Sequence, residues 1–327
     1  IAEGVWDGYA GNGEPYGFFN VALSSKFGRT GEKAKENCEG TNPCGEISLA
    51  DKECCNLAEL YLNNIESKQE LIECSKLLYK TQKAICSLPF IHDDTNKIVH
   101  KNFRIGQGVT GICQGLHNNK LEWLDDCYKA LKAFDKEWSK KQGWPESIKL
   151  TTVKPSGTLS LLAGATPGVH PAYSQYYIRR VRMSSQDALV ETCKNMGYHV
   201  EFVKNFDGTL NRDTVIVEFP CEAGNNAKLA KEMSAVDQLE LIKKIQKEWS
   251  DNAVSCTVYY KKEELYDIKE WLRENYKNNI KSVSFLLHQE HGFAQAPYEE
   301  IDEDTYKKLS KSIKKTLGTK VSNGHAL

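Results

Sequence analysis

The chain has 327 residues, of which 40% are hydrophobic and 27% are charged, a composition typical of a globular protein rather than a disordered or fibrous one. Its formal net charge of -1 provides no electrostatic basis for binding nucleic acid or a membrane surface, so we expect neither as a partner. No apolar run approaches the ~20 residues that a membrane-spanning helix needs.

The chain contains eleven cysteines. Their number is odd, their spacing is irregular and no two stand in a C-x-x-C pattern, which argues against a disulfide framework, a structural zinc site and a thioredoxin-like motif. We therefore expect reduced thiols, a cytoplasmic protein and no metal site. The first residue is not Met and no signal-type pattern follows it, so we expect part of a longer polypeptide.

Residues 26–37 are charged and poor in apolar side chains, which predicts a solvated helix or loop. The segment after them brings Asn42, Cys44 and Glu46 close together. In an extended conformation these side chains would share one face. Because Pro43 cannot donate a ladder hydrogen bond and Gly45 permits unusual backbone angles, a tight loop is the better interpretation. A thiol beside a general base is typical of a redox enzyme.

Beyond this loop, helix-like and strand-like segments alternate, which predicts an α/β fold. No repeat and no linker rich in Pro, Gly or Ser divides the chain, so we predict a single domain over residues 1–327. The predicted helices cover residues 67–87, 121–142, 235–251, 263–276 and 304–317, and the predicted strands cover residues 149–153, 214–219, 255–260 and 282–287.

Residues 106–111 mimic the G-x-G-x-x-G pattern of dinucleotide-binding folds. No strand-helix-strand unit with a suitably placed acidic residue surrounds them, so we expect these glycines to allow close packing instead. Residues 154–158, Lys-Pro-Ser-Gly-Thr, form a strand-to-helix turn that could present N–H groups and hydroxyls to a phosphate. An ordinary helix cap is the alternative. For His170 we expect a hydrogen-bonded loop residue, because no second metal ligand stands at a suitable spacing.

Several motifs together resemble one enzyme family. The segment 42–46, with Cys55 eleven residues after Cys44, is similar to the finger loop of ribonucleotide reductases of the adenosylcobalamin-dependent class, which remove the 2'-hydroxyl of ribonucleotides. The resemblance covers essentially the whole chain. It implies the C-terminal part of a ten-stranded α/β barrel, with the finger loop, about residues 40–60, threaded through its centre. Further similar motifs stand, in family order, at residues 152–160, 167–171, 176–180, 252–259 and 295–299.

The resemblance also implies roles for the loop residues. Cys44 would form the thiyl radical that removes the 3'-hydrogen of the ribose, Glu46 would be the general base on the 3'-hydroxyl, and Asn42 would orient the substrate. Cys55 resembles one of two cysteines that supply electrons and end as a disulfide, and its partner is expected in the part of the family's barrel that precedes this chain. Cys54 is a rival for this role, but neighbours in a strand face opposite sides, and the spacing from Cys44 favours Cys55.

For the substrate, the resemblance implies a ribonucleoside triphosphate whose phosphates are bound by Pro155, Ser156, Gly157 and Thr158. It implies adenosylcobalamin as cofactor, with no motif that marks its contact residues. Thioredoxin or a similar dithiol would be the reductant, and the chain would be inactive without the remaining N-terminal part of the reductase. Residues 282–287 lack the adjacent tyrosines of reductases that import a radical from a second subunit, which favours cobalamin.

Two alternatives stay open at this point. The chain could be part of a reductase of another radical class that acts on diphosphates, and a cofactor requirement would separate these two enzymes. It could also be a non-catalytic split fragment that binds nucleotide or complements another polypeptide.

Overall fold

The computed structural model describes residues 4–11, 16–33, 36–116, 119–205, 207–224, 227–287 and 295–314. The chain divides into two compact units, one formed by Ile1–Pro171 with Glu232–His288 and the other by Ala172–Lys231 with Gln289–Leu327. The single domain expected over residues 1–327 stays a prediction. The second unit contains a separate antiparallel sheet, built from three strands of Ala172–Lys231 and from Tyr298–Glu300.

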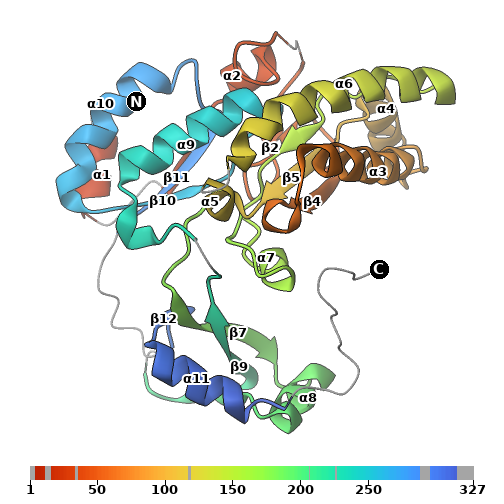
Figure 1. Ribbon diagram of the computed structural model, residues 1–327. Coiled ribbons are helices and arrows are strands. Elements are labelled where there is room, and N and C mark those ends of the chain that lie inside the picture. The colour runs from red at the N-terminus through yellow and green to blue at the C-terminus, as the bar shows by residue number, and fades with distance from the viewer. Residues whose placement is uncertain are drawn as a thin grey trace. The chain divides into compact units, whose positions relative to one another are not determined.

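The first unit contains parallel strands that follow one another in chain order (Figure 1). β4, β5 and β6 pair in parallel, as do β10 and β11. A parallel bridge between Val153 and Val254 connects the two groups, and β1 pairs antiparallel with β11. The predicted strands at 149–153, 255–260 and 282–287 are therefore confirmed. The bounds are β1 (Gly17–Phe19), β4 (Leu57–Tyr61), β5 (Gly106–Thr110), β6 (Thr151–Thr152), β10 (Thr257–Tyr260) and β11 (Ser282–Leu287).

The helices between these strands begin and end at clear sequence signals. The Ser67 side chain accepts a hydrogen bond from the Glu70 N–H at the start of α3, and Gly143 ends α6 in the left-handed conformation. The predicted helices at 67–87, 121–142, 235–251 and 263–276 are confirmed, with small shifts of their ends. The bounds are α1 (Gly4–Gly11), α2 (Val21–Lys26), α3 (Lys68–Cys86), α4 (Asp93–Asn102), α5 (Ile112–Gly115), α6 (Trp123–Gln142), α7 (Leu159–Leu162), α9 (Ala235–Glu248) and α10 (Leu265–Asn275).

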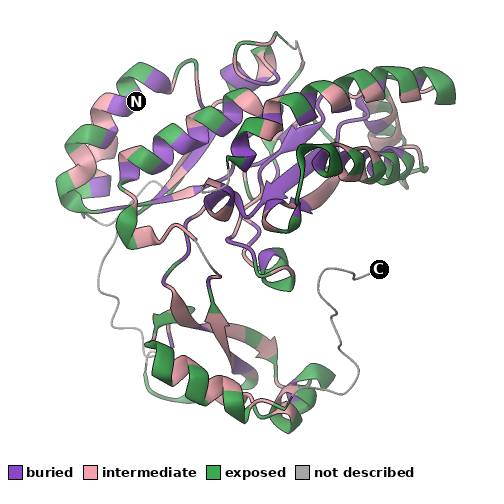
Figure 2. Cartoon of the chain, in the orientation of Figure 1, coloured by how far each residue is buried: buried purple, intermediate pink, exposed green. Residues whose placement is uncertain are grey.

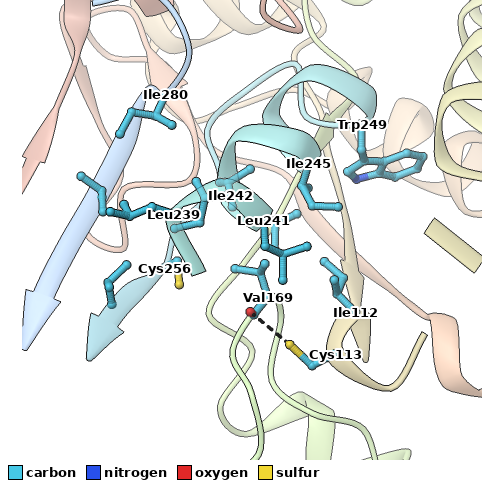
Figure 3. Close-up of a cluster of buried hydrophobic side chains, with 14 of the residues drawn as sticks. Ile112, Cys113, Val169, Leu239, Leu241, Ile242, Ile245, Trp249, Cys256 and Ile280 are labelled. Carbon is cyan, nitrogen blue, oxygen red and sulfur yellow. Dashed lines mark hydrogen bonds between the residues drawn. The ribbon is translucent and has the colours of Figure 1, made fainter. Parts of the chain in front are cut away.

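The core of the first unit lies between its strands and helices. Figure 2 shows buried strands and helices that are buried along one side only. Every residue of β5 is buried, as expected for a parallel strand covered on both faces. α9 supplies Leu239, Ile242 and Ile245 to a cluster that also contains Val169 and Cys256 (Figure 3). Cys256 is therefore a core residue.

The second unit has an antiparallel sheet in the order β12-β7-β9-β8. In its strand β7, ion pairs with Glu218 and Glu299 neutralise Arg180. The predicted strand at 214–219 lies within β9. The predicted helix at 304–317 is α11 as far as Ser312, where extended Ile313 ends it, and residues 315–317 lie outside the described residues. The bounds are β7 (Tyr176–Ser184), α8 (Ala188–Met196), β8 (His199–Lys204), β9 (Leu210–Glu222), β12 (Tyr298–Glu300) and α11 (Glu303–Ser312).

The segment at residues 26–37 corrects a prediction. The sequence indicated a solvated helix or loop, but Arg29 is buried and the carboxylate of Glu36 is fully buried between Arg104 and Lys149. Burial of a charge is favourable only when partners neutralise it. Those partners lie far along the chain, so the charge of the segment alone could not reveal them.

Candidate active site

The residues 42–47 form the tip of a hairpin. β2 (Gly40–Thr41) pairs antiparallel with β3 (Ser48–Leu49). Across the tip, the side-chain oxygen of Asn42 accepts a hydrogen bond from the Ile47 N–H at 3.0 Å, and the Gly45 N–H donates to the Asn42 carbonyl at 3.0 Å. Gly45 has a φ of 79°, in the region that favours glycine. The segment is thus the tight loop that the sequence favoured, not an extended strand.

Backbone contacts fix this loop to the ends of the parallel strands. The carbonyl of Glu46 accepts from the Ala253 N–H at 2.9 Å and from the Thr152 hydroxyl at 2.8 Å. A Cβ on Gly106 of β5 would lie 2.4 Å from Cδ1 of Ile47. Glycine is therefore needed at this point of β5 for the loop to approach the sheet. The loop is held by β5, by β6 and by the segment before β10, which lie far apart in the sequence.

The Cys44 thiol and the Glu46 carboxylate lie close together but differ in exposure. Cys44 is exposed, whereas Glu46 is 2% exposed and its Oε2 has no hydrogen-bond partner within the described part of the chain. Burial and the neighbouring Glu46 raise the pKa of Cys44, and Lys154 opposes this in part. The thiol form dominates at neutral pH, next to a carboxylate oxygen that can accept a proton.

The two adjacent cysteines have different surroundings. Burial and Glu46 raise the pKa of Cys55, and a hydrogen bond with the Asn42 side chain lowers it in part. Cys54 raises the pKa of Cys55 and also that of Cys86 of α3. Cys55 thus lies near Asn42 and Glu46, and its assignment as the electron donor stays a prediction.

The turn at residues 154–158 lies at the same site. The Ser156 hydroxyl donates to Oε1 of Glu59 at 2.8 Å, and Nζ of Lys154 lies 3.3 Å from Oε2 of Glu59. Thr158 precedes the short helix α7, but its side chain makes no capping hydrogen bond. An ideal Cβ on Gly157 would meet no atom within 4 Å. The side chains of Ser156 and Thr158 therefore do not cap the helix. Beside Gly157 the turn has open space.

Glu59 and Lys154 were absent from the sequence-predicted site residues. The Glu59 side chain is 4% exposed and projects from β4 towards Gly108, where a Cβ would lie 2.7 Å from its Oε2. Burial raises the pKa of Glu59, Ser156 and Lys154 lower it in part, and Glu46 adds to the rise. The sequence feature that could have identified Glu59 is its position as the single acidic residue in the apolar segment of β4, four positions after Cys55.

Two other predictions concern residues that lie outside this chemistry. His170 is a hydrogen-bonded loop residue, as predicted, because its Nδ1 donates to the Pro167 carbonyl at 2.9 Å and its Nε2 accepts from the Thr257 N–H at 3.0 Å. The glycines of residues 106–111 allow close packing, as predicted, since Gly106 and Gly108 both lie against side chains. In the parts of the chain that are described, no helix is long and apolar enough to cross a membrane.

Comparison with known proteins gives a consistent family. The family described as "Ribonucleotide reductase, barrel domain" matches residues 3–135 and 135–286. A probable adenosylcobalamin-dependent ribonucleoside-triphosphate reductase from Dictyostelium discoideum is 37% identical, over 87% of this chain and 38% of its own length. An adenosylcobalamin-dependent ribonucleoside-triphosphate reductase from Euglena gracilis is also 37% identical, over 96% of this chain and 44% of its own.

Solved structures agree with the sequences. The crystal structure of a B-12 dependent (class II) ribonucleotide reductase aligns with a TM-score of 0.82 at 34% identity, over 95% of this chain and 48% of that one. A class Id ribonucleotide reductase alpha subunit from Actinobacillus ureae, 16% identical with a TM-score of 0.55, shares the fold. The chain spans about half the length of the relatives that it matches.

Proposed function

Because the chain belongs to the ribonucleotide reductase barrel family, we propose that the polypeptide that carries it reduces ribonucleoside triphosphates to 2'-deoxyribonucleoside triphosphates, with adenosylcobalamin as cofactor. The relatives at 37% identity bear the names of such reductases. The observation that carries the proposal is the exposed Cys44 thiol beside the buried Glu46 carboxylate, whose Oε2 has no hydrogen-bond partner within the described residues. Cys55 lies beside the same carboxylate.

Cys44 is the residue that would face the cofactor. The Cys44 thiol is exposed at the tip of the hairpin, so a bound group could reach it. Bound adenosylcobalamin would supply the radical that converts the Cys44 thiol to a thiyl. The raised pKa of Cys44 suits this role, since a hydrogen atom can be taken from a thiol and not from a thiolate.

The remaining steps use side chains of this loop. The Cys44 thiyl removes the 3'-hydrogen of the ribose and Glu46 accepts the proton of the 3'-hydroxyl. The 2'-hydroxyl leaves as water with a proton from the cysteine pair, and Glu46 returns its proton to the 3'-oxygen when the sugar is reduced. Cys55 and a second cysteine supply two electrons and two protons and become a disulfide. The 3'-hydrogen returns from Cys44. Asn42, whose side chain shapes the loop, orients the substrate.

The turn at Pro155, Ser156, Gly157 and Thr158 would bind the substrate phosphates. It faces open space at Gly157, and Lys154 supplies a cation beside it. A dithiol protein such as thioredoxin would reduce the disulfide by exchange. The second cysteine would lie in the remaining N-terminal part of the reductase, since the chain spans about half of its relatives. We expect the protein to act in the cytoplasm, in the supply of deoxyribonucleotides for DNA synthesis.

The test uses the full natural polypeptide that carries this sequence. Conversion of ribonucleoside triphosphates and diphosphates is measured with a dithiol reductant, with and without adenosylcobalamin, for the wild type, Cys44→Ser and the matched control Cys74→Ser. We expect triphosphate reduction that requires the cofactor, is lost in Cys44→Ser and is retained in Cys74→Ser. Cofactor-independent reduction of diphosphates would move the protein to another radical class. No reduction under any condition would favour a fragment that binds nucleotide or complements another polypeptide.

A further inference from the structure

We propose that Glu59 is a positioning residue, which holds the turn at residues 154–158 in the conformation that receives the substrate phosphates. This inference rests on the proposed function, because it assigns the turn to phosphate binding. Its basis is that one buried carboxylate contacts two residues of the turn at once, Ser156 through Oε1 at 2.8 Å and Lys154 through Oε2 at 3.3 Å.

The turn has a backbone conformation that needs such support. Ser156 has a φ of 51°, in the left-handed region that a residue with a Cβ rarely adopts. Strain of this kind persists only where the surrounding structure compensates for it. The hydrogen bond from the Ser156 hydroxyl to Glu59 is the side-chain contact that the structure provides for this purpose. Without it, Ser156 would relax towards an ordinary conformation and the turn would change shape.

The same bond determines which groups can contact a phosphate. A serine hydroxyl has one proton to donate, and that of Ser156 is donated to Glu59. The hydroxyl therefore does not act as a phosphate donor while this bond exists. Within the described residues, the N–H groups of Gly157 and Thr158 have no hydrogen-bond acceptor. The turn thus offers backbone donors, and Glu59 orients them through Ser156.

The packing around Glu59 fits a residue held in one place. A Cβ at Gly108 would lie 2.7 Å from Oε2 of Glu59, and a Cβ at Gly168 would lie 2.2 Å from the Lys154 carbonyl oxygen. Glycines on both sides thus make room for the carboxylate and for the turn. Lys154 neutralises a carboxylate that would otherwise repel an anion at this place, and it also acts on the Cys44 thiol. The ion pair of Lys154 with Glu59 thus links the turn at residues 154–158 to the surroundings of Cys44.

The test compares Glu59→Ala, Ser156→Ala, Ser156→Gly and the double variant Glu59→Ala with Ser156→Gly in the full natural polypeptide. Equilibrium binding of a ribonucleoside triphosphate is measured beside KM and kcat. We expect Glu59→Ala and Ser156→Ala to raise Kd and KM by at least ~10-fold with a smaller change in kcat. Because glycine adopts a positive φ without strain, Ser156→Gly should bind more tightly than Ser156→Ala by several-fold and should restore most of the affinity lost in Glu59→Ala.

The matched control is Asp135→Asn, another buried carboxylate of the same unit, which pairs with Lys83 at 2.8 Å and does not contact the turn. It should lower thermal stability without raising KM. Equal losses of triphosphate affinity in Ser156→Ala and Ser156→Gly would show that the hydroxyl itself binds phosphate and would overturn the inference. Wild-type affinity in Glu59→Ala would overturn it too. A wild type that binds no triphosphate would instead refute the proposed function. If Glu59→Ala does not fold, the two Ser156 variants still decide the question.

Discussion

At the scale of single residues, the site is built to keep a thiol protonated. Burial and the carboxylate of Glu46 raise the pKa of Cys44, and Lys154 lowers it only in part. Reactive nucleophilic cysteines have the opposite surroundings, with cations that stabilise the thiolate. The environment of Cys44 therefore suits hydrogen-atom chemistry better than nucleophilic attack.

This electrostatic arrangement predicts how the reactivity of Cys44 responds to substitution. Glu46→Gln removes a negative neighbour, so the pKa of Cys44 should fall and alkylation near neutral pH should become faster. Lys154→Met removes the cation that lowers the pKa, so alkylation should become slower. Iodoacetamide labelling of Cys44 between about pH 7 and 10, followed by mass spectrometry, measures both. Unchanged rates in both variants would contradict the arrangement, and Cys74 in the same samples controls for general accessibility.

The two adjacent cysteines give a second prediction at this scale. Asn42 and Glu46 both act on the pKa of Cys55, and Cys54 acts on the pKa of Cys55 and on that of Cys86 of α3. Cys55→Ser should therefore abolish multiple-turnover reduction in the full natural polypeptide, while Cys54→Ser should retain it. Measurement of product formation with excess dithiol distinguishes the two variants. The reverse result would assign the electron donor to Cys54.

At the scale of elements, buried charges join the segment before the hairpin to the residues that precede β5 and β6. Glu36 is paired with Arg104 and Lys149, all three with almost fully buried side chains. Glu36→Gln should destabilise the protein by about 3–5 kcal/mol, because it leaves buried Lys149 without its carboxylate partner and Arg104 with Glu53 alone. Urea unfolding monitored by tryptophan fluorescence measures this loss. A change below about 1 kcal/mol, the usual value of a surface pair, would contradict it.

The same cluster predicts a dependence of stability on pH. Burial by itself would raise the pKa of Glu36, but Lys149 and Arg104 outweigh it and lower the pKa below its usual value. The stability that ionised Glu36 contributes is therefore present above its unfolded-state pKa of about 4.3 and is lost as pH falls through the lower folded-state pKa. The free energy of unfolding should decrease more steeply with acidification in the wild type than in Glu36→Gln. Parallel curves would contradict this assignment.

The contact between the hairpin and β5 depends on one glycine. Gly106→Ala would place a Cβ 2.4 Å from Cδ1 of Ile47, so the loop or the strand must shift, at a cost of about 1–3 kcal/mol. Gly40→Ala is the matched control, since its Cβ would meet nothing within 4 Å. In thermal unfolding, Gly106→Ala should therefore have a lower midpoint temperature than Gly40→Ala. Equal stability would mean that the loop adapts freely.

At the scale of the whole molecule, one sheet lies within the second unit and the other sheets lie within the first. Separate compact units commonly unfold in more than one transition. Ile216 of β9 and Ile242 of α9 are both fully buried, one in each unit. Ile216→Ala and Ile242→Ala should each cost about 2–5 kcal/mol and lower different calorimetric transitions. A single transition lowered equally by both variants would contradict independent unfolding.

The sequence by itself determined the local structure and the family. Apolar periodicity located α3 and α6 to within a few residues, Pro43 and Gly45 indicated a tight loop, and the ordered motifs identified a ribonucleotide reductase barrel that the comparisons confirm. These features depend on neighbouring residues, whose propensities and spacing are visible along the chain.

Only the tertiary structure decided which distant side chains meet. Ser156 bonds to Glu59 across 97 positions, and Glu36 pairs with Arg104 across 68 positions, although its own segment read as solvated. The tertiary structure also showed that β7, β8, β9 and β12 form a sheet separate from the other strands. The reason is physical: burial of a charge becomes favourable only through partners that strand order and packing bring to it, and neither strand order nor packing is encoded within a short stretch of sequence.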